Sequence, residues 1–162
     1  MKVIVGSSDI ELSPDIVYSI AAILATLEPD EGTAIRTNSE GYPASALERL
    51  VRSVSARMGR ECREFSPTKG GRAAVFHRDY DMVDEATSVH AYFSVGREMS
   101  GGTSHVVKAA LDRGAEVEAW GMDPSGTLRL IGSQERSDES FERKIEQIHS
   151  SVLYQMLEEH GE

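Results

Sequence analysis

Residues 88–120 read SVHAYFSVGREMSGGTSHVVKAALDRGAEVEAW, and the order of apolar runs and glycines in them decides the fold. Residues 88–95 form a short apolar run with β-branched and aromatic side chains, which is typical of a buried strand. The following helical pattern has its apolar side chains at helical spacing: Val106, Val107, Ala110 and Leu111. Gly114 stands where a glycine commonly ends a helix, and residues 115–120 form another strand-like run. A strand, a helix and a second strand in this order predict two parallel strands joined by a right-handed crossover.

The chain before this unit repeats the same alternation. Strand-like runs lie at residues 2–5, 33–36 and 61–65, and helical patterns lie at residues 14–27, 44–58 and 74–85. Ser13 followed by Pro14 is typical of a helix start, with serine as the N-cap and proline at the first helical position. The pattern therefore predicts an α/β fold, a Rossmann-like three-layer sandwich around a mainly parallel, five-stranded sheet.

Residues 121–162 follow this core, which spans residues 1–120. Residues 127–131 are interpreted as an extra antiparallel edge strand of a hairpin, and residues 138–159 as a C-terminal helix with one apolar stripe. The stripe either packs on the same chain or faces a second subunit. No composition shift marks an internal boundary, so residues 1–162 are expected to form a single domain.

The overall charge and the single cysteine narrow the classes of function. The formal net charge is -10, which disfavours general binding to nucleic acid or to an anionic membrane. Cys62 is the only cysteine of the chain, so no internal disulfide is expected, and we interpret it as a structural thiol. The first apolar run is too short for a signal peptide or a membrane span, and a cytoplasmic location is the expectation.

Three loops are expected at the carboxyl ends of the strands, where open parallel sheets bind ligands. They are residues 6–9, 37–43 and 96–103. The third loop contains Gly101 and Gly102 directly before a helix, where free backbone amides and the helix dipole attract an anion such as phosphate. An alternative is that the glycine pair serves only a tight turn. The loop nearly spells a Walker A motif, but Gly102 replaces the lysine, so nucleotide hydrolysis by that route is not expected.

Several short motifs resemble a known superfamily. They are MKVIVGS at residues 1–7, Arg78-Asp79, MVDEA at residues 82–86, SGGTSHVVKAA at residues 100–110 and RGAEV at residues 113–117. On these motifs, residues 1–120 resemble the SLOG superfamily of Rossmann-like domains. That superfamily includes the Lonely-Guy phosphoribohydrolases, the DprA proteins and a branch of small uncharacterised nucleotide-sensor-like domains.

The resemblance implies a nucleotide or nucleotide-derived ligand over the glycine loops and a homodimer or higher homo-oligomer. It does not carry over the phosphoribohydrolase activity. Ser100 replaces the first proline of the Lonely-Guy motif, one glycine is missing, and Val106 stands in place of its glutamate. Valine cannot stabilise the positive charge that develops on the sugar carbon.

From the loops and the resemblance, nine residues are predicted to bind the ligand: Gly6, Ser7, Ser8, Arg78, Gly101, Gly102, Thr103, Ser104 and His105. Arg78 would serve as a charge clamp on phosphate, and Arg36 and Arg72 are alternative candidates for the same role. Taken singly, however, Arg36, Arg72 and Arg78 are each interpreted as solvated or salt-bridged surface arginines. No catalytic residue, cofactor or metal is predicted, because His77 and Asp81 lack further ligands and no serine has a nucleophile-elbow motif.

Three hypotheses of function follow. The first is a non-catalytic binding module for a nucleotide-like phosphate compound. The second is an enzyme that cleaves the glycosidic bond of a nucleoside 5′-monophosphate, with Glu40 or Glu98 as the carboxylate. The third is an interaction protein that assembles through the C-terminal helix and has a vestigial pocket.

Overall fold

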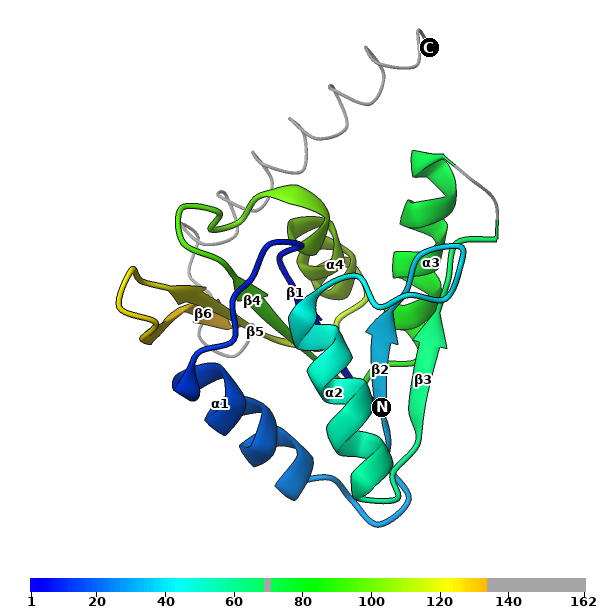
Figure 1. Ribbon diagram of the computed structural model, residues 1–162. Helices are drawn as coiled ribbons and strands as arrows, with labels where there is room; N and C mark the ends of the chain where they lie inside the picture. Colours follow the sequence, from blue (N-terminus) through cyan, green and yellow to red (C-terminus); the bar gives the residue numbers. More distant parts are fainter. Residues whose placement is uncertain (69–70, 134–162) are drawn as a thin grey trace, which may run out of the picture.

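A computed structural model describes residues 1–68 and 71–133 (Figure 1). Within these residues, strands and helices alternate along the chain as the sequence predicts. The strands are β1 Lys2–Gly6, β2 Thr33–Arg36, β3 Cys62–Phe65, β4 Ser88–Phe93, β5 Glu116–Met122 and β6 Leu128–Ser133. The helices are α1 Pro14–Ala25, α2 Ala46–Arg57, α3 Arg72–Asp84 and α4 Gly101–Asp112.

The strands form one six-stranded sheet in the order β3-β2-β1-β4-β5-β6. Strands β1 to β5 are parallel, and β6 pairs antiparallel with β5 as the edge strand of a hairpin. The predicted α/β class, the five parallel strands and the extra hairpin are therefore confirmed. The strand order reverses direction at β1, because the chain moves outward to β3 and then returns to place β4 on the other side of β1.

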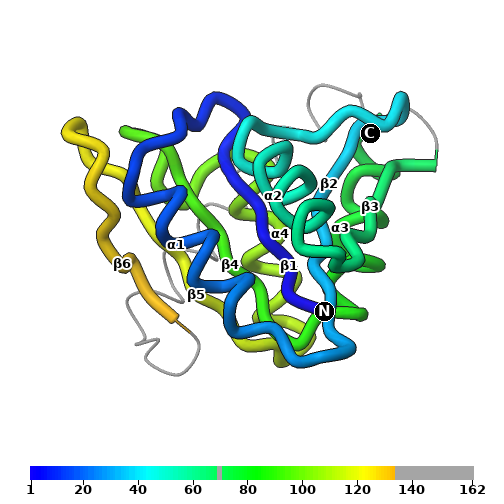
Figure 2. Tube along the Cα trace, turned by 60° about the horizontal axis from the view of Figure 1, so that its bottom comes forward, coloured from blue at the N-terminus to red at the C-terminus, as the bar shows by residue number. Residues whose placement is uncertain are grey.

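Helices cover both faces of the sheet (Figures 1 and 2). Two apolar clusters hold them there. On one face, Ile4, Ile35 and Tyr92 pack with buried side chains of α1 and α2. On the other face, Val5, Val89 and their neighbours pack with buried side chains of α3 and α4. Each buried strand contributes alternate side chains to both clusters, as expected for parallel strands that are covered on both sides.

The helix starts and ends follow local chemistry. Ser13 Oγ accepts a hydrogen bond from Ile16 N–H at the start of α1, and Ser45 Oγ accepts one from Glu48 N–H at the start of α2. Gly114, with a φ of +73°, follows the C-cap of α4 in the left-handed conformation that glycine adopts readily.

Helix α4 begins three residues earlier than predicted, at Gly101 instead of Ser104. Glycine is a poor helix former inside a helix, so the pair was assigned to the loop. At the first turn, however, glycine lets the chain bend sharply into the helix, and Gly101 does so with a φ of +72°. The two glycine amides therefore belong to the helix N-terminus.

The phenol of Tyr92 lies in the core and makes the fold sensitive to alkaline pH. Its Oη is 2.6 Å from Ser19 Oγ on α1, and burial raises the pKa of Tyr92 to about 12 from an ordinary value of 10.0. Between these pH values the folded chain keeps a proton that the unfolded chain has lost. Tyr92 therefore contributes stability that is fully present below pH 10 and declines as the pH rises toward 12.

We expect the difference in free energy of unfolding between the native chain and Tyr92→Phe to change by about 2 kcal/mol between pH 9 and pH 12. Guanidinium unfolding at a series of pH values measures this difference, and the variant removes the effects of all other titrating groups. A difference that stays constant with pH would show that the phenol is not desolvated in the native state.

The described residues contain no helix that is both long and apolar enough to cross a membrane. The predicted C-terminal helix at residues 138–159 lies outside the described residues.

Candidate anion-binding site

The candidate site lies at the carboxyl ends of β1 and β4, where the strand order reverses. Ser7 N–H donates to the Tyr92 carbonyl, and Ser94 N–H donates to Ser7 Oγ, so the loops after the two strands are held together. Connections that diverge from adjacent strands leave a crevice beyond the sheet, which is the usual ligand position in this architecture. The loop after β4 leads into the N-terminus of α4 at this crevice.

A cavity of about 130 Å³ opens at this position. It is lined by Ser7, Ser8, Arg36, Ala44, Arg97, Ser100, Gly101, Gly102 and Thr103. Drug-sized ligands occupy pockets of roughly 300–1,000 Å³. The cavity is therefore large enough for one small charged group but too small for a whole nucleotide.

The first residues of α4 line this cavity, and the start of the helix has no side-chain cap. Ser100 is the N-cap residue, but its hydroxyl donates to the Arg97 carbonyl and makes no capping bond to the helix. Helix geometry leaves the first amides without intrahelical acceptors. Among the described residues, no side chain accepts from the N–H groups of Gly101, Gly102 or Thr103. These donors and the helix dipole together favour a bound anion.

Arg36, which lines the cavity, forms a buried ion pair with Glu48, which lies behind the cavity wall. Arg36 Nη2 is 2.7 Å from Glu48 Oε1, and the side chains of the two residues are 6% and 0% exposed. Glu48 also accepts from the backbone N–H groups of Gly6 and Arg36 and from Ser45 Oγ. One carboxylate thus ties together the end of β1, the end of β2 and the start of α2.

Arg36 is held in the charged state and lines the cavity. Burial disfavours its charge, but the attraction and hydrogen bonds of Glu48 outweigh burial and raise the pKa of Arg36. Nη2 also donates to the Gly6 carbonyl and to Thr103 Oγ1, at 2.7 and 3.3 Å. Nη1 has no hydrogen-bond acceptor in the part of the chain that the structure describes. A Cβ added to Gly102 would stand 3.7 Å from Nη1, so this free nitrogen lies beside the helix N-terminus.

Five predicted ligand residues come together in the cavity wall: Ser7, Ser8, Gly101, Gly102 and Thr103. Gly6 lies behind the wall, where its N–H donates to Glu48 and its carbonyl accepts from Arg36. The N-terminal loop and the glycine-rich loop therefore meet at one point, although they are about ninety residues apart in sequence.

The other three predicted residues, Ser104, His105 and Arg78, do not line the cavity. The Ser104 hydroxyl donates to the Gly101 carbonyl within α4. His105 Nδ1 is 2.9 Å from Asp79 Oδ2 on α3, and its ring stacks on Phe76. The His105 side chain therefore points from α4 toward α3.

Arg78 is buried beside the same Asp79 carboxylate that His105 contacts. Its guanidinium donates to Asp79 and to the Thr37 carbonyl. The expectation that Arg36 and Arg78 are surface arginines is wrong, because the two residues are 5% and 8% exposed. Each is buried against a carboxylate, which satisfies its charge inside the protein.

Sequence reasoning misses Arg97 and Glu48 and offers Arg36 only as an alternative phosphate-binding arginine; the structure places Arg36 in the cavity wall. One sequence signal could have marked Glu48 as a residue with a structural role. Ser45 and Glu48 have the spacing of a capping box at the start of a predicted helix. The Glu48 side chain, however, turns away from that role toward Arg36 and Gly6. Arg97 is half exposed and lies 3.5 Å from Asp9, at the mouth of the site.

The carboxylates proposed for glycosidic cleavage do not line the cavity. Glu98 pairs with Arg129 on the edge strand at 2.6 Å, and Glu40 lies exposed in the loop after β2. Within residues 1–68 and 71–133, no three His, Cys, Asp or Glu side chains are grouped to hold a metal ion. The site as described offers positive charge and amide donors, and it can hold an anion.

No protein-family model matches the chain, and no curated protein matches it in sequence.

Proposed function

We propose that this chain is a small-molecule-binding domain that holds the phosphate group of a nucleotide or nucleotide-derived compound at the N-terminus of α4. The observation that carries the proposal is the free Nη1 of buried Arg36 beside uncapped helix amides. A buried arginine that lines a polar cavity and has an unused donor matches the charge and the fork geometry of a phosphate group.

The volume of the cavity shapes this proposal. About 130 Å³ accommodates a phosphate, and the remainder of the ligand would lie outside, over the loops after β1, β2 and β4. Ser7 and Ser8, which also line the cavity, are the hydroxyl-bearing residues of the loop after β1. We propose binding without catalysis, because no carboxylate among residues 1–68 and 71–133 lines the cavity to support a developing positive charge on a sugar ring.

A panel of compounds tests the proposal. Nucleoside monophosphates, nucleoside diphosphates and inorganic phosphate should raise the melting temperature, while unphosphorylated nucleosides should not. Binding to the native state stabilises it by mass action, by about 2.7 kcal/mol when the ligand is at 100 times its dissociation constant. A response to nucleosides alone, or to no compound of the panel, would contradict the proposal.

Arg97 offers a test by substitution with a matched control. Arg97→Met should weaken phosphate binding about two- to tenfold, because an exposed charge at the mouth contributes roughly 0.5–1.4 kcal/mol to an anion. Arg113→Met is the control, since Arg113 lies at the other end of α4, is similarly exposed and pairs with Asp84. Isothermal titration calorimetry with inorganic phosphate compares the two. Equal losses of affinity would indicate a nonspecific charge effect.

A further inference from the structure

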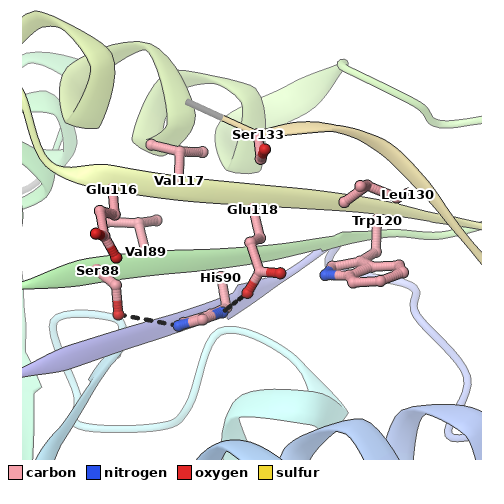
Figure 3. Close-up of a pocket in the computed structure, with 9 residues that line it drawn as sticks. All are labelled: Ser88, Val89, His90, Glu116, Val117, Glu118, Trp120, Leu130 and Ser133. Atoms are coloured by element: carbon pink, nitrogen blue, oxygen red, sulfur yellow. Dashed lines mark hydrogen bonds and ion pairs between the residues drawn. The ribbon is translucent and has the colours of Figure 1, made fainter. Parts of the chain in front are cut away.

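A second cavity, of about 440 Å³, lies at the other end of the sheet (Figure 3). It opens on the face covered by α1 and is lined by Ser88, Val89, His90, Glu116, Val117, Glu118, Trp120, Leu130 and Ser133. Its volume is within the range of sites for small organic ligands. It shares no lining residue with the anion-binding cavity. The inference below therefore does not depend on the proposed function.

A serine and a histidine are in contact inside this cavity. Ser88 Oγ is 3.0 Å from His90 Nε2, and both residues are buried. They are two residues apart on β4, so their side chains lie on the same face of the sheet. Figure 3 shows the imidazole of His90 between Ser88 and a carboxylate.

That carboxylate belongs to Glu118 on β5. His90 and Glu118 are direct register partners, and His90 Nδ1 lies 2.9 Å from Glu118 Oε1. The N–H direction is not aligned for a good hydrogen bond, so the contact is mainly electrostatic and strengthens when the imidazole takes up a proton. The polar contact with His90 lowers the pKa of Glu118 in spite of partial burial, and the carboxylate is ionised at neutral pH.

The order of contacts is serine to Nε2 and carboxylate to Nδ1. This order lets a histidine remove the proton from a serine hydroxyl while the carboxylate stabilises the resulting imidazolium. The arrangement arises from the pairing of β4 and β5, and no nucleophile-elbow motif is needed to create it. The function proposed above leaves all three residues unused.

We propose that Ser88, His90 and Glu118 form a site that hydrolyses small carboxylic esters that carry no negative charge. Ser88 Oγ bonds to the carbonyl carbon while His90 Nε2 takes the hydroxyl proton. The carbon–oxygen bond to the leaving alcohol then breaks, and the alcohol takes that proton from His90. Water then bonds to the acyl carbon while His90 takes one of its protons. The bond between that carbon and Ser88 Oγ breaks, Ser88 Oγ takes the proton from His90, and the carboxylic acid leaves.

Other residues around the cavity define the substrate class and the charge balance. Trp120 and Leu130 provide an apolar end for an acyl or aryl group, while Glu116 and Glu118 repel anionic substrates.

The oxyanion of the reaction needs a partner other than the backbone of β4. Strand β4 is paired on both sides, so its N–H groups already donate within the sheet. Lys2 is the register partner of Ser88 on β1, on the same face of the sheet, and its charge also contributes to lowering the pKa of Glu118. Its ammonium is the group that we assign to stabilising the oxyanion.

Hydrolysis of p-nitrophenyl acetate and p-nitrophenyl butyrate tests the proposal. Ser88→Ala should lower kcat/KM by about 100-fold or more, in keeping with the contribution of general-base and nucleophilic groups. Glu118→Gln should lower kcat with little change in KM and alter the pH profile of kcat, because Glu118 acts through His90. The controls are Ser53→Ala and His77→Gln, which change an exposed serine and an exposed histidine elsewhere.

Labelling of the unaltered chain gives a readout that does not depend on the folding of a variant. A fluorophosphonate should modify Ser88 at one equivalent per chain, as mapped by peptide mass spectrometry. Ester hydrolysis that survives in folded Ser88→Ala, or labelling at other serines with Ser88 unmodified, would overturn the proposal. Phosphate binding by the same variant should remain at the native level, which separates this site from the anion-binding site.

Discussion

Glu48→Gln should lower the free energy of unfolding by about 3–5 kcal/mol, because it leaves the charge of Arg36 buried without its counter-charge. The Glu48 side chain is fully buried and accepts from Arg36, from Ser45 and from two backbone N–H groups. An amide of the same shape has only one oxygen for these donors. A loss of this size is a large part of the 5–15 kcal/mol that is typical of a domain.

Urea unfolding followed by circular dichroism measures this loss, and Glu64→Gln is the matched control. Glu64 forms an ion pair with Arg52 in which both side chains are more than a third exposed, so its loss should cost less than about 1 kcal/mol. The double variant Arg36→Met/Glu48→Leu should regain only part of the stability, since it leaves no unpaired charge but removes the acceptor of the backbone N–H groups at positions 6 and 36. If the free energy of unfolding of Glu48→Gln lies within 1 kcal/mol of the native value, the Arg36–Glu48 pair is hydrated and the prediction is contradicted.

Gly102→Val should weaken the binding of phosphate compounds by about 10- to 100-fold, the largest effect expected on ligand affinity. A Cβ at Gly102 stands 3.7 Å from Arg36 Nη1, and the two methyl groups of valine extend into a cavity of about 130 Å³. Loss of one hydrogen bond to a charged group costs roughly 1.5–3 kcal/mol, which corresponds to this range of affinity.

Two variants separate occlusion of the cavity from damage to the helix. Gly102→Ala adds only an atom at ordinary contact distance, so the fold should keep its stability and the affinity should fall less than with valine. Ala73→Val places the same side chain in the first turn of α3 and should leave binding unchanged. Calorimetric titration with inorganic phosphate measures all three. An unaltered affinity in Gly102→Val would place the ligand elsewhere.

The order of elements could be predicted from sequence because each depends on local patterns. The spacing of Val106, Val107, Ala110 and Leu111 indicates a helix in isolation, and Ser13-Pro14 marks a helix start. The sequence also predicted that the loops at residues 6–9 and 96–103 meet, since parallel strands bring their carboxyl ends to one edge of the sheet. The start of α4 was misplaced because the left-handed φ of Gly101 cannot be read from the letter alone.

The charge partners could not be predicted, because they depend on tertiary packing and strand register. Arg36 and Glu48 are twelve residues apart and meet only because α2 packs over the ends of β1 and β2. His90 and Glu118 meet only because β4 and β5 pair in one particular register. A shift of one residue would turn Glu118 to the other face of the sheet.

The central claim is that the uncapped amides of α4 and the free nitrogen of Arg36 bind the phosphate of a small molecule. Two-dimensional ¹H–¹⁵N NMR during titration with inorganic phosphate and with a nucleoside monophosphate tests it most directly. The account predicts saturable shifts at the amides of Gly101, Gly102 and Thr103 and at the Arg36 guanidinium, with both ligands. Unchanged signals at these groups, while other residues shift or none do, would contradict it.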